Sequence, residues 1–311
     1  MNLDTTHVAR ELDRHAITET SAEQSGLTVV IPVFNEEEAI EGTLHRVINV
    51  LREFGWQYEV IVVNDGSTDR TASLLRHALA RGDVRIIEHP SNTGYGAALK
   101  TGVRYARFPW IAIVDADGTY PLEQLPHLGK FIRDADMVVG ARFGAQTQPR
   151  GVRGIARNLL RGFAQWLTHR KIPDLNSGLR IFRRDVAERF LRILPDGFSF
   201  TSTITLAMLT QGYRVHFEPI RYYQRIGRSK IRPVRDTFNF FRLIVRTSIY
   251  FAPLRVFMPV AMVFFTVFLA MLSWDVFVSR NLTEHTLIFL TAATQLGFFA
   301  LLADMIDKRC G

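Results

Sequence analysis

The sequence is poor in cysteine and in lysine. Its 311 residues include one cysteine, Cys310, so the chain by itself can form neither an internal disulfide nor a cysteine-based zinc cluster. Five of the 38 basic residues are lysines and the rest are arginines, whose planar guanidinium suits bidentate contact with phosphate. The net charge of +8 is therefore compatible with an anionic partner, although a general preference for arginine codons would give the same composition.

Disorder signals, a secretion signal and cofactor loops are also missing. Hydrophobic residues make up 47% of the chain and charged residues 22%, which excludes a disordered chain or a collagen. Residues 1–26 are polar and have no hydrophobic core, so we expect a flexible N-terminal extension and not a secretion signal. The glycine-rich segment lacks both the Gly-Lys-Ser/Thr of a Walker loop and a GxGxxG after a strand, so a dinucleotide cofactor is not expected.

From Leu27 onward, short apolar runs alternate with stretches of helical periodicity. We expect strands over 27–33, 58–64, 84–89, 110–117 and 136–142, with helices near 37–54, 69–81, 95–107 and 122–132. This alternation predicts an α/β domain with a mostly parallel, doubly wound sheet. Ligands bind at the carboxyl ends of the strands in such sheets, and polar residues gather at those ends here.

The last quarter of the sequence is different. Residues 256–274 and 286–303 form two runs without a charge, each close to the ~20 residues that cross a ~30 Å hydrocarbon core. Joined by the short polar loop 275–285, they predict a transmembrane hairpin, with a pair of buried core helices as the alternative. Basic residues flank the hairpin at its two ends, whereas the loop has only Arg280, so the positive-inside rule predicts that both termini and the α/β domain are cytoplasmic.

Just before the hairpin, residues 235–251 combine a basic and an aromatic stripe. Arg235, Arg242 and Arg246 recur at helical spacing, and Phe238 and Phe241 fall on the other side. This pattern predicts an amphipathic helix in the lipid headgroup plane, with packing onto the globular domain as the rival.

The clearest chemical motif is Asp115-Ala116-Asp117, which directly follows an apolar run. Two carboxylates at i and i+2 beyond the end of a strand can face one ion. Hard divalent cations such as Mg²⁺ or Mn²⁺ prefer carboxylates, water and substrate phosphates, and they neutralise a diphosphate leaving group. The motif alone is weak, because acidic residues also end many strands as caps and turns.

Several motifs in order make the chain resemble family 2 glycosyltransferases of the GT-A fold: IPVFNEE (31–37), VVNDGSTDRT (62–71), NTGYGAALKTG (92–102), VDADGTYP (114–121) and GARF (140–143). The pieces DLNSGLRIFRR (174–184), GYRVHFEPI (212–220) and RIGRSKI (225–231) are similar to the branch that glycosylates polyprenyl phosphates. Dolichyl-phosphate mannose synthases and bacterial undecaprenyl-phosphate sugar transferases form this branch, and the hairpin is like that of its bacterial members.

The resemblance implies roles for individual residues. It places the nucleotide-sugar donor at Pro32, Phe34, Glu36, Asp65 and Ala116, with Asp65 accepting from the base. It also implies Asp115 and Asp117 as the catalytic pair that holds Mg²⁺ or Mn²⁺ at the diphosphate, with Arg142 beside them. Two departures bear on these roles, because Thr119 stands where several relatives have a metal-binding Gln and Phe34 replaces a common Tyr.

The acceptor side follows from chemistry. An attacking sugar hydroxyl needs a general base, usually a carboxylate, and many relatives have one near the start of a late helix. The comparable stretch here, residues 197–209, has no Asp or Glu. A lipid phosphate is already an anion and needs cations to hold it, for which we predict Arg142, Arg157, Arg180, Arg225, Arg228 and Lys230.

Together these observations predict an inverting hexosyltransferase. It would move one sugar from a UDP- or GDP-sugar to a polyprenyl (undecaprenyl or dolichyl) phosphate at the cytoplasmic membrane face, for cell-envelope glycan synthesis, and it could be a homo-oligomer. The expected organisation is an extension (1–26), a GT-A domain (27–232), an interfacial helix (233–253) and a transmembrane hairpin (254–311). The alternatives are another membrane lipid or lipid-linked saccharide as acceptor, or a non-catalytic nucleotide-sugar-binding membrane scaffold.

Overall fold

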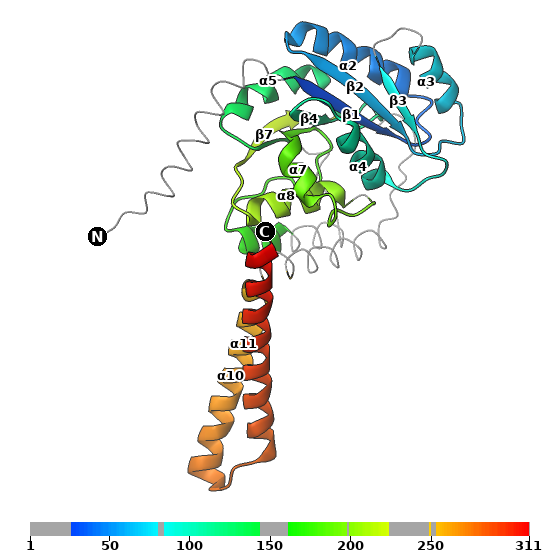
Figure 1. The fold of residues 1–311 in the computed structure, drawn as a ribbon. Coiled ribbons are helices and arrows are strands. Elements are labelled where there is room, and N and C mark those ends of the chain that lie inside the picture. Colours follow the sequence, from blue (N-terminus) through cyan, green and yellow to red (C-terminus); the bar gives the residue numbers. More distant parts are fainter. Residues whose placement is uncertain are drawn as a thin grey trace.

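The computed structural model describes residues 26–79, 84–143, 161–197, 199–223 and 253–310, together with Ile249. A rounded α/β domain carries a two-helix hairpin, which projects from it like a stalk (Figure 1). The predicted extension (1–26, of which only Gly26 is described) and most of the predicted interfacial helix (233–253) lie outside the described residues.

The α/β domain is built on a seven-stranded sheet of order β3-β2-β1-β4-β6-β5-β7. Neighbouring strands run parallel except where β6 pairs with β4 and β5. This confirms the predicted mostly parallel sheet. The strands are β1 (Leu27–Val33), β2 (Tyr58–Asn64), β3 (Arg85–Glu88), β4 (Trp110–Ile113), β5 (Met137–Phe143), β6 (Arg180–Arg183) and β7 (Val215–Arg221).

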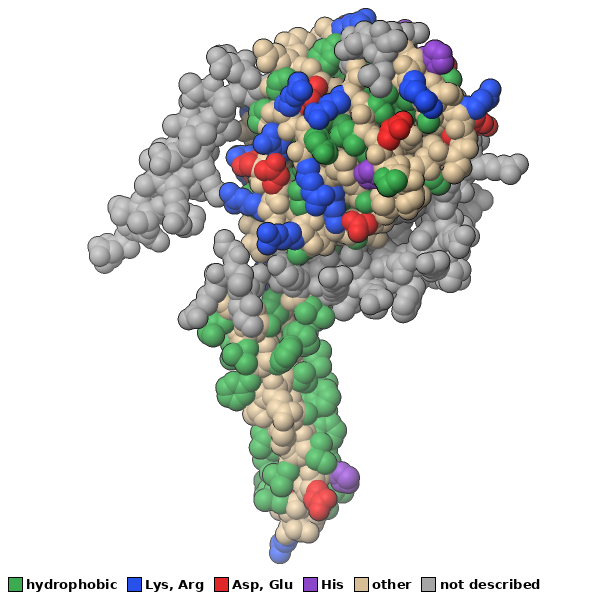
Figure 2. All heavy atoms as spheres, turned by 45° about the vertical axis from the view of Figure 1, so that its right-hand side comes forward, with side chains coloured by type: hydrophobic (Ala, Val, Ile, Leu, Met, Phe, Trp, Pro, Cys, Tyr) green, Lys and Arg blue, Asp and Glu red, His purple; other side chains and the backbone are tan. Residues whose placement is uncertain are grey.

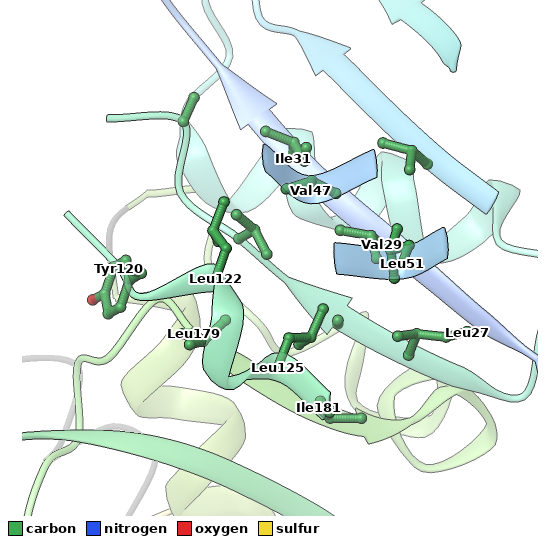
Figure 3. Packing of buried hydrophobic residues seen from close by; sticks show 14 of the residues in the cluster. Leu27, Val29, Ile31, Val47, Leu51, Tyr120, Leu122, Leu125, Leu179 and Ile181 are labelled. Carbon is green, nitrogen blue, oxygen red and sulfur yellow. The ribbon is translucent and has the colours of Figure 1, made fainter. Parts of the chain in front are cut away.

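Helices cover both faces of the sheet, because the central strands are apolar on both sides. On β1, Leu27, Val29 and Ile31 pack into one core with helix α2, whereas Val30 belongs to the core on the other face (Figure 3). The helices of the domain include α2 (Ile40–Phe54), α3 (Thr71–Leu79), α4 (Tyr95–Tyr105), α5 (Leu125–Gly129), α7 (Arg184–Phe190) and α8 (Phe200–Thr210), and residues 161–168 are helical as well.

Two predicted elements differ from the structure. The strand expected over 110–117 ends at Ile113, so Asp115 and Asp117 lie in the turn that follows β4. The helix expected over 122–132 is divided into a 3₁₀ turn (η1, Leu122–Gln124), the short α5 and a second 3₁₀ turn (η2, Lys130–Arg133). Pro126 at the start of α5 explains the first break, because its ring allows the first turn of a helix but not its interior.

The hairpin consists of α10 (Pro253–Trp274), a π-helical turn η4 (Asp275–Ser279) and α11 (Glu284–Cys310). The two long helices contact each other through the aromatic pairs Phe257–Phe299 and Phe264–Phe289, whose ring centroids are 5.4 and 5.7 Å apart. At the base of the hairpin, the guanidinium of Arg255 donates to the carbonyl of Leu167 in the α/β domain.

The surface of the hairpin is apolar. Residues Pro253–Ser279 and Glu284–Met305 are both long and apolar enough to cross a membrane, and only 6% and 17% of their most apolar stretches are buried. Figure 2 shows hydrophobic side chains along the hairpin and charged ones over the α/β domain. The alternative of two buried core helices is therefore wrong, and the hairpin is a candidate membrane anchor.

Candidate active site

One cleft of about 490 Å³ lies at the carboxyl ends of the central strands. All the residues that we predicted for the donor and for catalysis line it. They are joined there by residues that we did not predict. The lining consists of Pro32, Val33, Phe34, Glu36, Asp65, Asn92, Gly94, Tyr95, Ala98, Asp115, Ala116, Asp117, Tyr120, Arg142, Asn176, Thr201 and Tyr222.

The acidic pair is held in a set geometry. The Tyr95 hydroxyl donates to Oδ1 of Asp115 at 2.7 Å, and the Thr119 hydroxyl donates to Oδ1 of Asp117 at 2.6 Å. Burial, together with the nearby charge of Asp117, raises the pKa of Asp115 to about 6. The Tyr95 hydrogen bond and the charges of Arg142 and Arg180 act to lower this pKa, but they do not outweigh burial and the charge of Asp117.

This donor set fits a divalent cation that is shared with a substrate. Among the described residues, no group of three or more His, Cys, Asp or Glu gathers that could enclose a metal. The pair could therefore supply two carboxylate ligands, and phosphate oxygens and water would have to complete the shell, as Mg²⁺ tolerates well. Thr119 orients Asp117 in this structure through its hydroxyl and its backbone N–H.

Asp65 follows β2 and connects two loops of the cleft. One of its oxygens accepts from the N–H and hydroxyl of Thr93 and lies 2.8 Å from Nδ1 of His89, and the other accepts from the N–H of Gly94. Burial acts to raise the pKa of Asp65, but these hydrogen bonds hold it below its usual value. Gly66, next to Asp65, allows the chain to pass close to the backbone of Ser91. Its φ is +69°, and a Cβ at this position would lie 2.5 Å from the backbone of Ser91.

Arg142, at the end of β5, enters the cleft as part of an ion pair. Its Nε and a terminal nitrogen donate to the two oxygens of Asp174 at 2.6 and 2.9 Å, and its guanidinium lies 5.4 Å from the ring centre of Tyr222. Burial opposes the charge of Asp174, but the Arg142 guanidinium keeps the pKa of Asp174 below its usual range. The bidentate contact with Asp174 fixes the orientation of the Arg142 guanidinium at the edge of the cleft, where it could contact a bound anion.

Arg180 does not reach the cleft surface. It is fully buried in β6, and its guanidinium donates to the carbonyls of Ser177 and Thr201 and to the hydroxyl of Thr205. The predicted direct contact between Arg180 and an acceptor phosphate is therefore wrong in this structure. The reason is that an arginine at this strand position points into the layer between the sheet and α8.

The remaining predicted phosphate-binding cations, Arg157, Arg225, Arg228 and Lys230, lie outside the described residues. Of the six cations that we predicted for the acceptor, Arg142 is the one that lines the cleft among the described residues.

Sequence analysis missed several lining residues and one ion-pair partner. Tyr95 and Tyr120 stand within motifs that we had quoted, beside Gly94 and Thr119, so their position was a usable signal. Asn176 and the partner Asp174 also stand within a quoted motif, DLNSGLRIFRR (174–184), and Thr201 stands within the quoted stretch 197–209. Tyr222 lies outside the quoted motifs, and no local pattern marks it as lining a cleft.

A mixed sheet with an acidic pair after its central strand is the architecture of a GT-A glycosyltransferase. The model of the family "Glycosyl transferase family 2" matches residues 28–191, more than half of the chain, and a model described as "GtrB C-terminal hairpin" matches residues 252–308. The chain therefore belongs to glycosyl transferase family 2, as its motifs had indicated.

Curated relatives have related names. The chain is 35% identical over 211 residues to the dolichyl-phosphate hexose transferase of Haloferax volcanii, covering 67% of this chain and 87% of that one. It is 30% identical over 225 residues to the low-salt glycan biosynthesis hexosyltransferase Agl6 of the same organism, covering 70% and 53%. The undecaprenyl-phosphate 4-deoxy-4-formamido-L-arabinose transferase of Edwardsiella ictaluri is 32% identical over 167 residues, covering 53% and 51%. The chain thus spans about half the length of the last two relatives.

Solved structures share the fold. Glucosyl-3-phosphoglycerate synthase from Mycobacterium tuberculosis, in complex with Mn²⁺, UDP and phosphoglyceric acid, superposes with a TM-score of 0.56 at 20% identity, over 76% of this chain and 81% of that one. A complex of the same enzyme with Mn²⁺, UDP-glucose and phosphoglyceric acid gives 0.55 at 21% identity, over 76% and 82%. This likeness confirms the predicted GT-A fold.

Proposed function

We propose that the protein transfers one sugar from a nucleotide-sugar to a polyprenyl phosphate, with inversion, at the cytoplasmic face of a membrane. The proposal rests on the combination of groups in the cleft and on the hairpin attached to the domain. The cleft combines an acidic pair, an oriented arginine and a helix start without a carboxylate, and it belongs to a domain that is attached to an apolar hairpin. The relatives named for dolichyl and undecaprenyl phosphate support the same acceptor class.

The acidic pair would hold the donor through a divalent cation. Asp115 and Asp117 are the residues that fit this role, and Tyr95 and Thr119 orient their carboxylates. When bound, Mg²⁺ or Mn²⁺ supplies positive charge for the diphosphate of the leaving nucleotide. Pro32, Phe34 and Glu36 would line the nucleoside part, and Asp65 would shape that part by holding the Thr93–Gly94 loop.

The transfer itself needs no proton acceptor. A phosphate oxygen of the lipid attacks the anomeric carbon and forms the new C–O bond, while the bond from that carbon to the diphosphate oxygen breaks. The nucleoside diphosphate leaves with the electron pair, and an α-linked donor gives a β-linked product. Arg142, held by Asp174, is placed to stabilise negative charge in this cleft. The proposed phosphate acceptor agrees with α8, which contains no acidic residue.

The activity is tested with purified full-length protein in nanodiscs. A panel of UDP- and GDP-sugars is offered with undecaprenyl phosphate, with and without Mg²⁺ or Mn²⁺, and with undecaprenol as the hydroxyl control. We expect metal-dependent transfer to the phosphate and none to the alcohol. Efficient glycosylation of undecaprenol would show that the cleft contains a general base, and a hydroxyl acceptor would replace the phosphate in the proposal.

The proposed orientation uses the single cysteine as a probe. If both termini are cytoplasmic, a membrane-impermeant maleimide should label Cys310 in inside-out vesicles and not in intact cells. An Arg280→Cys, Cys310→Ser variant should give the opposite pattern, since residue 280 lies at the tip of the hairpin. The same pattern for both proteins would refute the hairpin topology.

A further inference from the structure

The N-terminus of α8 forms one wall of the cleft and has a free hydrogen-bonding group. Thr201, at the second position of this 11-residue helix, lines the cleft and is 3% exposed. Its carbonyl accepts from Arg180 and Thr205, but its side-chain hydroxyl has no hydrogen-bond partner among the described residues. A buried hydroxyl without a partner costs free energy, so it needs a ligand to satisfy it.

The N-terminus of α8 also has no side-chain cap. Ser199 occupies the N-cap position of α8 and makes no side-chain capping bond, so the partial positive charge of the helix start is not met there. The helix begins without an acidic residue in its first turn. An anion in the cleft would therefore meet a favourable electrostatic potential at this wall.

A buried cation lies directly behind this wall. Arg180 bonds to the carbonyls of Thr201 and Ser177, and no carboxylate lies within ion-pair distance of it in the described part of the chain. Burial lowers the pKa of Arg180 to about 10, so the guanidinium stays charged at neutral pH. Buried charges are usually paired, and the carboxylates of Asp174 and Asp115 act on this one from beyond ion-pair distance.

Arg180 also connects α8 to the acidic pair. Its partner Ser177 precedes Gly178, where a Cβ would lie 2.0 Å from Oδ2 of Asp115. The N–H of Gly178 in turn donates to the Tyr120 hydroxyl at 2.6 Å. The contacts from Thr201 through Arg180 and the Ser177–Gly178 segment to Asp115 thus fix how far Thr201 lies from the proposed diphosphate site.

We propose that the start of α8, with the Thr201 hydroxyl as donor and the Arg180 cation behind it, is the subsite that holds the attacking phosphate of the acceptor. The inference rests on the proposed function and adds the residues that bind its acceptor. Thr201 is then a binding residue, and Arg180 is a positioning residue that also supplies charge without contact. A neutral sugar hydroxyl could use the Thr201 hydroxyl, but it would gain nothing from the positive charge of Arg180.

The test compares three variants of one helix in the full-length protein. Thr201→Val removes the hydroxyl at nearly constant volume, Thr201→Ser keeps it, and Thr203→Val is the matched control. Thr203 is as buried as Thr201, but its hydroxyl donates to the Ser199 carbonyl and it does not line the cleft. Steady-state kinetics vary undecaprenyl phosphate at saturating donor, and then the donor at saturating acceptor.

Thr201→Val should raise the KM for undecaprenyl phosphate about ten- to a hundredfold, the expected effect of losing one hydrogen bond to a charged group. Its KM for the donor and its rate of donor hydrolysis by water should stay within about twofold of the wild type, on the same scale. Thr201→Ser and Thr203→Val should keep the acceptor KM. An unchanged acceptor KM in Thr201→Val, or a raised donor KM instead, would overturn the inference.

A binding experiment separates this inference from the proposed function. The protein is loaded with nucleoside diphosphate and metal, and its affinities for undecaprenyl phosphate and undecaprenol are measured. We expect the wild type to prefer the phosphate and Thr201→Val to lose most of that preference. If the wild type binds the phosphate in this way but transfers no sugar to it, the proposed function fails and the subsite stands. Equal affinity of the wild type for both lipids refutes the subsite.

Discussion

The α/β domain and the hairpin use apolar residues in opposite ways. In the domain, side chains such as Ile31, Ile61 and Phe182 are fully buried between the sheet and its helices. In the hairpin, Met262 and Phe298 are 63% and 68% exposed, on helices whose contacts within the described part of the chain are mostly with each other. Apolar surface of this extent is not stable in water. The domain therefore makes its own core, whereas the hairpin needs a surrounding apolar phase.

Polar groups show the reverse contrast. The cleft of the domain brings together the part-buried charges of Asp65, Asp115, Asp117 and Arg142, where they can act on a ligand. The hairpin has one buried carboxylate, Asp275, among its described residues, and this group is used internally: it accepts from Thr283 and Thr286 at the tip. The described side chains that could act on a ligand therefore lie in the domain, and we expect the hairpin to hold the domain at a membrane.

The largest effect is expected at the acidic pair of the domain. Asp117→Asn removes one charge at the proposed metal site, so turnover should fall by at least roughly a hundredfold, as for other lost electrostatic stabilisers. The melting temperature should barely change, because Asp117 is half-buried at the cleft. The measurement is turnover together with thermal unfolding, with the surface variant Asp185→Asn as control. Near-normal turnover of Asp117→Asn, or full activity in EDTA, would remove the metal assignment.

Asp65→Asn should affect the stability of the domain. The amide would place an N–H₂ against the Thr93 or Gly94 N–H, and a buried donor left without an acceptor costs about 2 kcal/mol. Since the pKa of Asp65 is lowered, its stabilisation is complete above the unfolded pKa of about 3.9 and is lost only as the pH falls below it.

The Asp65 prediction is measured by denaturant unfolding at several pH values. The difference between the wild type and Asp65→Asn should persist from pH 5 to pH 8 and shrink as the pH falls below about 3.9. Glu88→Gln, an exposed change on the neighbouring strand, should have no effect. A difference that shrinks as the pH rises from 5 to 8 would contradict the lowered pKa of Asp65, because the stabilisation by a group with a raised pKa is lost with rising pH.

Removal of the hairpin tests whether the α/β domain folds and binds its donor without it. Truncation after Arg232 keeps every described residue of the cleft and deletes both apolar helices. We expect a soluble protein that binds nucleotide-sugar normally. Transfer to undecaprenyl phosphate in vesicles should fall about tenfold or more, because the domain is no longer concentrated at the membrane. A short-chain, water-soluble polyprenyl phosphate serves as the control acceptor. A truncated chain that cannot fold would show that the hairpin belongs to the catalytic core.

The smallest effect is expected at the hairpin tip. Asp275→Asn weakens the hydrogen bonds from Thr283 and Thr286, and such bonds between membrane helices contribute about 1 kcal/mol. The measurement is unfolding in mixed micelles. Ser273→Ala is the matched control, since its hydroxyl bonds only to the carbonyl of Leu269 in its own helix. Turnover should be unchanged in both variants, and a loss of turnover in Asp275→Asn alone would give the tip a role beyond structure.

Local patterns were sufficient for the strands and helices near the N-terminus. The strands predicted over 27–33 and 58–64 have those bounds in the structure, and α4 begins at Tyr95 as expected. These elements are buried on two faces or are amphipathic, so each one shows its environment in its own composition. The later strands β6 and β7 were not predicted, because β6 is short and runs antiparallel between distant partners, and β7 follows a long stretch of mixed character.

Composition and order determined the class of this protein: apolar runs set the parallel sheet and the hairpin, and the motifs after the strands set the family and the cleft. Only the tertiary structure shows where the side chains of the individual arginines and of Thr201 lie and what they contact. Arg142 and Arg180 look alike in the sequence, yet one is paired with Asp174 at the cleft and the other is buried beneath α8. The physical reason is that a side chain's hydrogen-bond partners and burial are set by segments far away in the chain, which no local pattern encodes.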